Sequence, residues 1–167
     1  TGLLRLTETG KKLALQNGAR RFLVPRRISV AEQQHDAFVT NVRLRLESLW
    51  NGTFVCERAI LEEKLPLIPD GLFYFKSGKA VALEVENSDK GRTRFLVLAA
   101  RWKEMSSVAA VLYVATREPL FRALKKYLAV TDSSVPLALV YWESLRDSKP
   151  KVWTPRGEIA LFDRKEM

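Results

Sequence analysis

Apolar residues recur every three or four positions between residues 29 and 50, and this spacing predicts an amphipathic helix. The apolar stripe consists of Val39, Val42, Leu46 and Leu49. Ser29 and Glu32 match a capping box, in which a serine side chain and a glutamate three residues later each accept a hydrogen bond from the other's backbone N–H. His35 lies four residues before Val39, on the apolar stripe.

Strand-like segments rich in β-branched and aromatic residues follow this helix, and helices and strands then alternate. The strands are expected at residues 53–57, 67–75, 79–86, 108–114 and 137–142, the helices at 92–105 and 117–128, and a small hairpin at 151–161. An antiparallel meander that leads into parallel crossovers makes a mixed sheet. The predicted fold class is therefore α/β, with a mixed central sheet flanked by helices on both faces.

The turn between the second and third strands decides which side chains share a face. A three-residue loop, Lys76-Ser77-Gly78, places Asp70 opposite Glu84, and Glu86 then lies on the same face. A two-residue turn would place Val85 opposite Asp70 and separate the acids. The two faces of the third strand favour the first register, one carrying Val81, Leu83 and Val85 and the other Ala82, Glu84 and Glu86.

Three carboxylates on one face repel one another unless a cation lies between them. Mg²⁺ or Mn²⁺ prefers such oxygen ligands and can activate water against a phosphodiester. Asp70 and Glu84 are therefore the expected metal ligands, and Glu86 completes the cluster. In the alternative interpretation, Glu84 and Glu86 lie at an exposed strand end and pair with the basic side chains of Lys90, Arg92 or Arg94.

Basic residues exceed acidic ones, which gives a formal net charge of +9. Residues 1–27 hold seven basic side chains and one acid, so most of the excess is concentrated there. A concentrated basic segment favours a polyanionic partner, here DNA, although a solvated surface is the alternative. The expected nucleic-acid contacts are Lys11, Lys12, Arg20, Arg21, Arg26, Arg27, Arg92 and Arg94.

Several classes of protein do not fit the chain. Cys56 is the only cysteine, which excludes an internal disulfide and a cysteine-rich zinc site. No apolar run is long enough to cross a bilayer, and the first residues lack the basic and apolar stretches of a signal peptide, so a cytoplasmic protein without a membrane partner is expected. The oligomeric state stays open, with a homodimer as one option.

Two resemblances to known families follow from these motifs. Leu6-Thr7, Gly10 and Leu13 resemble the last strand and closing helix of a winged-helix domain, which divides the chain into residues 1–27 and an α/β domain at 28–167. Residues 29–142 resemble the PD-(D/E)xK nuclease superfamily, through Pro69-Asp70, through Glu84-Val85-Glu86 and through the order of the elements. This resemblance implies a restriction-endonuclease-like core and metal-dependent cleavage of DNA.

More narrowly, the chain resembles the replication-relaxation proteins of plasmids and mobile elements, in which a winged helix precedes a nuclease-like domain. The matching positions are His35-Asp36, Pro69-Asp70, Glu84-Val85-Glu86 and residues 87–93. The resemblance implies a site role for His35, whose alternative is a satisfied core histidine. The resemblance to the wider nuclease superfamily implies an extra metal-binding role for Glu57 at the end of the first predicted strand, and the alternative is an ion pair with Arg58 or Lys64.

Glu86 occupies the position where the nuclease superfamily has its lysine. Lys90 is the best candidate to supply that charge from the following loop, and Lys79 and Lys103 are poorer ones by position. Three functions therefore stay open: a metal-dependent endonuclease with Asp70, Glu84, Glu86 and Lys90 as its catalytic set, an inactive DNA-binding module on the same fold, and a protein–protein adaptor.

Overall fold

A computed structural model describes Lys12 and residues 29–61 and 65–161 of the chain. Its seven strands form one mixed sheet in which spatial order follows chain order. The strands are β1 (Gly52–Cys56), β2 (Gly71–Phe75), β3 (Ala80–Glu86), β4 (Val108–Ala115), β5 (Leu137–Tyr141), β6 (Lys151–Thr154) and β7 (Gly157–Ala160). Only the β3–β4 and β4–β5 pairs are parallel. The predicted α/β class with a mixed sheet flanked by helices is confirmed.

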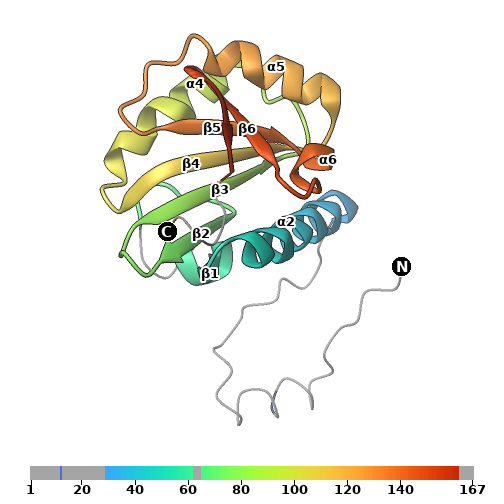
Figure 1. Cartoon of the computed structure of the whole chain (residues 1–167), viewed down its shortest axis with the longest axis vertical. Helices are drawn as coiled ribbons and strands as arrows, with labels where there is room; N and C mark the ends of the chain where they lie inside the picture. Colours follow the sequence, from blue (N-terminus) through green and yellow to red (C-terminus); the bar gives the residue numbers. More distant parts are fainter. Residues whose placement is uncertain (1–11, 13–28, 62–64, 162–167) are drawn as a thin grey trace.

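Helices cover both faces of the sheet, as Figure 1 shows. The longer helices are α2 (Val30–Leu49), α4 (Arg92–Arg101), which continues into a 3-10 turn at Trp102–Glu104, and α5 (Glu118–Leu128); the one-turn helices are α3 (Glu57–Ile60) and α6 (Trp142–Leu145). Helix α2 lies along one face, and α4 and α5 lie along the other. No helix in the described part of the chain combines the length and apolarity needed to cross a membrane.

Helix α2 begins and packs as its sequence predicts. The Ser29 hydroxyl accepts a hydrogen bond from the Glu32 backbone N–H, and the Glu32 carboxylate accepts one from the Ser29 N–H. Val42 and Leu46 are fully buried against β3 and β4, in the core that contains Leu83 and Leu112. The helix is thereby held against the sheet through its apolar stripe.

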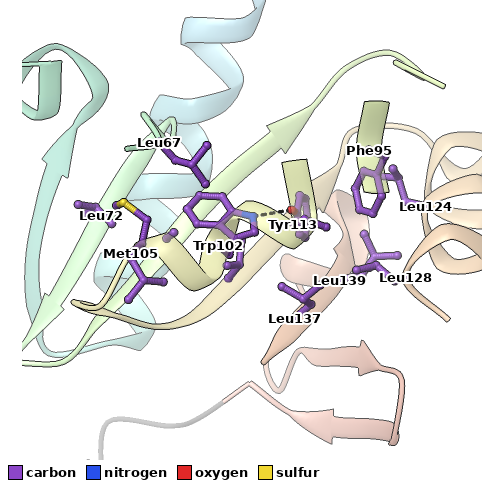
Figure 2. Packing of buried hydrophobic residues seen from close by; sticks show 14 of the residues in the cluster. Leu67, Leu72, Phe95, Trp102, Met105, Tyr113, Leu124, Leu128, Leu137 and Leu139 are labelled. Atoms are coloured by element: carbon purple, nitrogen blue, oxygen red, sulfur yellow. Dashed lines mark hydrogen bonds between the residues drawn. The ribbon is translucent and has the colours of Figure 1, made fainter. Parts of the chain in front are cut away.

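The opposite face of the sheet packs under α4 and α5 in a second core (Figure 2). Phe95, Trp102 and Leu124 of the helical layer pack in one cluster with Tyr113 and Leu139 of the central strands. The alternating side chains of β3 divide between the two cores, because successive residues of a strand point to opposite faces. Ala80 and Ala82 therefore lie on the face that also carries Glu84 and Glu86.

Two predicted boundaries beside Asp70 are wrong. The second strand begins at Gly71 rather than at residue 67, because Pro66 and Pro69 have no N–H to donate to a strand ladder. Glu57 does not end the first strand but begins α3, and its backbone N–H donates to the Asp70 carbonyl at 3.2 Å. Asp70 consequently sits in the connection just before β2, beside the start of α3.

Candidate functional site

The β2–β3 hairpin has the register that brings the acids together. Gly71 pairs with Leu83 and Leu72 with Ala82, so the same register places Asp70 opposite Glu84. The Phe75 N–H donates to the Lys79 carbonyl at 2.9 Å, which leaves the three-residue loop Lys76-Ser77-Gly78 between the paired residues. Gly78 closes this loop at a φ of 78°, in the left-handed region that favours glycine. The predicted three-residue loop is therefore confirmed.

A cavity of about 210 Å³ lies between β3 and α4, and we call it the inner cavity. Asp70, Glu84, Glu86 and Lys90 line it, together with Tyr113 of β4. At roughly 30 Å³ for each liquid water molecule, its volume corresponds to a few water molecules or a hydrated ion. The three acids that the strand pattern groups therefore share one small, partly enclosed space.

Apolar and aromatic groups form the rest of the inner-cavity wall. Phe95, Leu98 and Trp102 reach it from the α4 layer. The Trp102 indole N–H donates a hydrogen bond to the Tyr113 hydroxyl oxygen at 2.8 Å (Figure 2). Burial, followed by the negative charge of Glu84, raises the pKa of Tyr113, so the hydroxyl keeps its proton. The acids consequently face a low-dielectric wall that strengthens charge interactions inside the cavity.

Glu86 is the least exposed charged residue among residues 29–61 and 65–161, with 3% of its surface exposed. Lys90 Nζ donates a hydrogen bond to Glu86 Oε1 at 3.1 Å and lies 3.0 Å from Oε2. The Oε2 contact is an ion pair by distance without hydrogen-bond geometry, so this buried oxygen has no hydrogen-bond donor in the described structure. Glu86 is therefore neutralised by a single cation and keeps one unused acceptor.

Glu84 lies between the other two acids and has no ion-pair partner in the described part of the chain. Burial raises its pKa well above the usual range, and the charges of Asp70 and then Glu86 raise it further. Lys90 opposes this shift only partly. The ionised form of Glu84 is thus disfavoured until additional positive charge enters the cavity.

Asp70 is held from two directions. Its Oδ2 accepts a hydrogen bond from the backbone N–H of Val85 at 2.6 Å, which ties the residue to β3. Its Oδ1 lies 2.8 Å from Nε2 of His35, which comes from α2 on the other side. With 15% of its side chain exposed, Asp70 is a largely buried carboxylate in a fixed orientation.

His35 connects Asp70 to Asn87. The Asn87 amide nitrogen donates to Nδ1 of His35 at 3.1 Å, which leaves Nε2–H to donate to Asp70. This is the arrangement of a neutral ring. A protonated ring needs an acceptor at Nδ1, and rotation of the amide would supply one, since the buried Asn87 Oδ1 has no donor among the described residues. This contact places the ring beside Asp70, and the site role of His35 stays a prediction.

An outer cavity of about 580 Å³ adjoins the inner one, and Asp70, Glu86 and Lys90 line both. His35, Glu57 and Arg58 lie around it, together with Asn87. A smaller hollow of about 280 Å³ borders the same Asp70 and His35. Asp70 and Glu86 therefore form the boundary between a small inner space and a wider opening.

Glu57 lies at the rim of the outer cavity, where it is exposed. Burial raises its pKa, and the negative charge of Asp70 raises it further. Of the two alternative ion-pair partners, Arg58 pairs with Asp36 at 3.6 Å instead, and Lys64 lies outside the described residues. Glu57 is thus close enough for the charge of Asp70 to shift its pKa, although it does not line the inner cavity.

Arg92 and Arg94 lie in the exposed first turn of α4, which directly follows the loop that carries Lys90. That turn contains no acid, so its positive charges add to the positive end of the helix dipole. Lys12 is exposed, and the other predicted basic contacts, Lys11, Arg20, Arg21, Arg26 and Arg27, lie outside the described residues, as does the winged-helix motif apart from Lys12.

Sequence reasoning missed Asn87, Tyr113 and Trp102. Asn87 directly follows Glu86, so its proximity was visible, but its contact with His35 joins residues 52 positions apart. Tyr113 is paired with Glu84 in the parallel β3–β4 register. Nothing in the local pattern of either strand predicts that register, because a crossover helix separates them.

The donor set at this boundary consists of hard oxygen ligands. Burial and the charges of Asp70 and Glu86 raise the pKa of Glu84 although Lys90 is near, so a further cation would stabilise its ionised form. Within the described residues, no three histidine, cysteine or acidic groups converge tightly enough to hold one ion as they stand. The side chains would therefore have to close around an ion by rotation.

The titration of His35 is a direct test of this geometry. The hydrogen bond to Asp70 raises the pKa of His35, against the opposing effect of burial. We expect the imidazole to titrate above 6.5 in the folded protein and to return to or below that value in Asp70→Asn. Since His35 is the only histidine, one imidazole resonance in an NMR pH titration reports it.

The sign of the linked stability follows from that shift. A raised folded-state pKa means that the His35–Asp70 contribution is complete below pH ~6.5 and is lost as pH rises through the higher folded-state value. An imidazole that titrates below 6.5 in the wild type, or one that is unmoved by Asp70→Asn, would contradict the contact.

No protein-family profile, curated protein or solved structure matches this chain. The function therefore has to be inferred from the site itself.

Proposed function

We propose that this protein binds DNA and cleaves phosphodiester bonds with the help of a divalent metal ion, on a restriction-endonuclease-like core. The observation that carries the proposal is the meeting of Asp70, Glu84 and Glu86 at one inner cavity, with Lys90 at the same boundary. Burial and the charges of Asp70 and Glu86 raise the pKa of Glu84, and an acid perturbed in this way inside a cavity is a usual mark of a reactive site.

Asp70 and Glu84 would hold Mg²⁺ or Mn²⁺, and Glu86 would assist. Such an ion, when bound, lowers the pKa of water and polarises a phosphoryl oxygen. The described residues fit it in chemistry, since all three offer carboxylate oxygens and Lys90 is the only lysine among the described residues that line the inner cavity.

The chain's own residues prepare the site. The His35 ring and the Val85 N–H fix the orientation of the Asp70 carboxylate from opposite sides. The apolar wall of Phe95 and Trp102 limits water on the inner side. Among the described residues, Lys90 is the only lysine that lines either cavity. It would supply the positive charge that the nuclease superfamily takes from a lysine at the position of Glu86.

Basic groups near the opening would hold the DNA backbone. Arg92 and Arg94 extend from the turn after Lys90, and the basic segment at residues 1–27 adds further positive charge. Contacts of this kind bind phosphate without reading sequence, and their affinity falls with salt. The resemblance to replication-relaxation proteins suggests plasmid or mobile-element DNA as the substrate.

Incubation of supercoiled plasmid with the protein and Mg²⁺ or Mn²⁺, with EDTA as the metal-free control, tests the proposed cleavage. We expect conversion to nicked or linear DNA only when the metal is present. Binding of labelled DNA, followed by filter retention across a salt series, should weaken steeply as salt rises. Absence of cleavage with both metals would reject the enzyme.

A second function is favoured by one observation, the replacement of the superfamily's lysine by a buried glutamate that is already ion-paired. In this case the fold would bind DNA without cutting it. Salt-dependent binding without cleavage would establish this function. Binding with no salt dependence would reject both nucleic-acid functions and leave the protein–protein adaptor.

A further inference from the structure

We propose that Lys90 is the resident counter-ion of Glu86, that it and a divalent metal ion exclude each other at this carboxylate, and that metal binding releases the Lys90 ammonium into the outer cavity to meet a phosphate. This inference rests on the proposed function, because it concerns the same carboxylate cluster. It assigns Lys90 two alternating partners, an acid of the protein and an oxyanion of the substrate.

Lys90 and a metal ion would compete for one carboxylate. Glu86 is almost completely buried, and Lys90 Nζ lies within 3.1 Å of both of its oxygens. A divalent cation that used either oxygen would be placed within a few ångströms of the ammonium, where like charges repel strongly because the surroundings are largely apolar. The ammonium and the metal ion would therefore compete for Glu86.

The Lys90 side chain has space into which it can move. It is 36% exposed and lines the outer as well as the inner cavity. Rotation about its flexible stem can move the ammonium from Glu86 into the wider space. Glu86 is the more restricted of the two side chains, because only 3% of its surface is exposed.

The loop that carries Lys90 need not move. Arg117 donates a hydrogen bond to the Asn87 carbonyl at 2.8 Å. Asp89 accepts hydrogen bonds from the Gly91 N–H at 2.8 Å and from the Tyr127 hydroxyl at 2.9 Å. These contacts hold the backbone on both sides of Lys90. Only the lysine side chain has to exchange partners.

Phosphate is the chemical class that fits the released group. A lysine ammonium binds phosphate oxygens as a point charge, and the outer cavity also borders Arg58. Without metal, Lys90 would remain paired with Glu86 and be less available to DNA. The exchange thus couples metal occupancy to phosphate binding.

Isothermal titration with Mn²⁺ tests the competition without measuring cleavage. Lys90→Gln should bind Mn²⁺ more tightly than wild type, by roughly tenfold. Glu86→Gln should bind it more weakly. Lys79→Gln, an exposed lysine on the β2–β3 hairpin, is the matched control and should equal wild type.

The outcomes separate the two proposals. Equal or weaker Mn²⁺ binding by Lys90→Gln overturns the exchange, while the metal-dependent function still stands. Absence of Mn²⁺ binding in both wild type and Lys90→Gln overturns the metal-dependent function as well.

Amine labelling of the wild type gives a second readout, which does not depend on whether Lys90→Gln folds. Mn²⁺ should raise the acylation rate of Lys90 several-fold relative to Lys79, as measured by peptide mass spectrometry. An unchanged ratio of the two rates overturns the release of Lys90.

Discussion

Replacement of Asp70 by asparagine is expected to lower the rate of metal-dependent plasmid cleavage by at least roughly 100-fold, since changes in groups that only support metal ligands already cost about 10–100-fold and Asp70 is proposed as a ligand itself. Asparagine has nearly the same shape as aspartate but no negative charge. It also replaces one carboxylate oxygen with a donor, which disturbs the contact with either the Val85 N–H or the His35 ring.

Asp132→Asn is the matched control, because Asp132 is exposed and lies away from both cavities. It should cleave at the wild-type rate. DNA binding by Asp70→Asn, measured by filter retention, should change little, since the phosphate contacts are proposed to be basic. Equal cleavage by Asp70→Asn and wild type would reject Asp70 as a ligand and with it the proposed site.

The largest expected effect on folding is that of Leu46→Ala. Leu46 is 1% exposed and joins α2 to the core under β3 and β4. Truncation of a buried leucine leaves a cavity and costs about 2–5 kcal/mol of unfolding free energy. Urea denaturation with linear extrapolation measures the change.

Leu44→Ala is the control for Leu46→Ala, because Leu44 lies on the same helix and is 58% exposed. Its effect should stay within about 0.5 kcal/mol. A loss for Leu46→Ala as small as that of Leu44→Ala would mean that α2 is not held by this packing. Since α2 carries His35, the same packing holds the imidazole at Asp70.

The site is a concentration of negative charge in a basic protein. Its acids meet at the carboxyl end of β3, next to the carboxyl end of the parallel strand β4, where α/β sheets commonly bind ligands. Lys90, Arg92 and Arg94 follow within one loop and one helical turn. Metal and phosphate would therefore approach the same boundary, where the acids proposed to bind the metal ion lie next to the basic side chains proposed to bind phosphate.

Local patterns alone determined much of this arrangement. The capping box of α2 and its apolar stripe depend only on residues within a few positions of each other. The loop length at Gly78 set the hairpin register, and the two-residue period of a strand then put Glu84 and Glu86 on one face opposite Asp70. The acid cluster could therefore be predicted from turn length and strand alternation alone.

Tertiary structure decided what those acids contact. His35 meets Asp70, Tyr113 faces Glu84, and Trp102 supports Tyr113 only because α2, β4 and α4 are packed around β3. The burial of Glu86, and hence the strength of its ion pair with Lys90, also depends on those layers. The physical reason is range: turns and periodicities act over a few residues, whereas burial and electrostatics depend on every element that folds against a group.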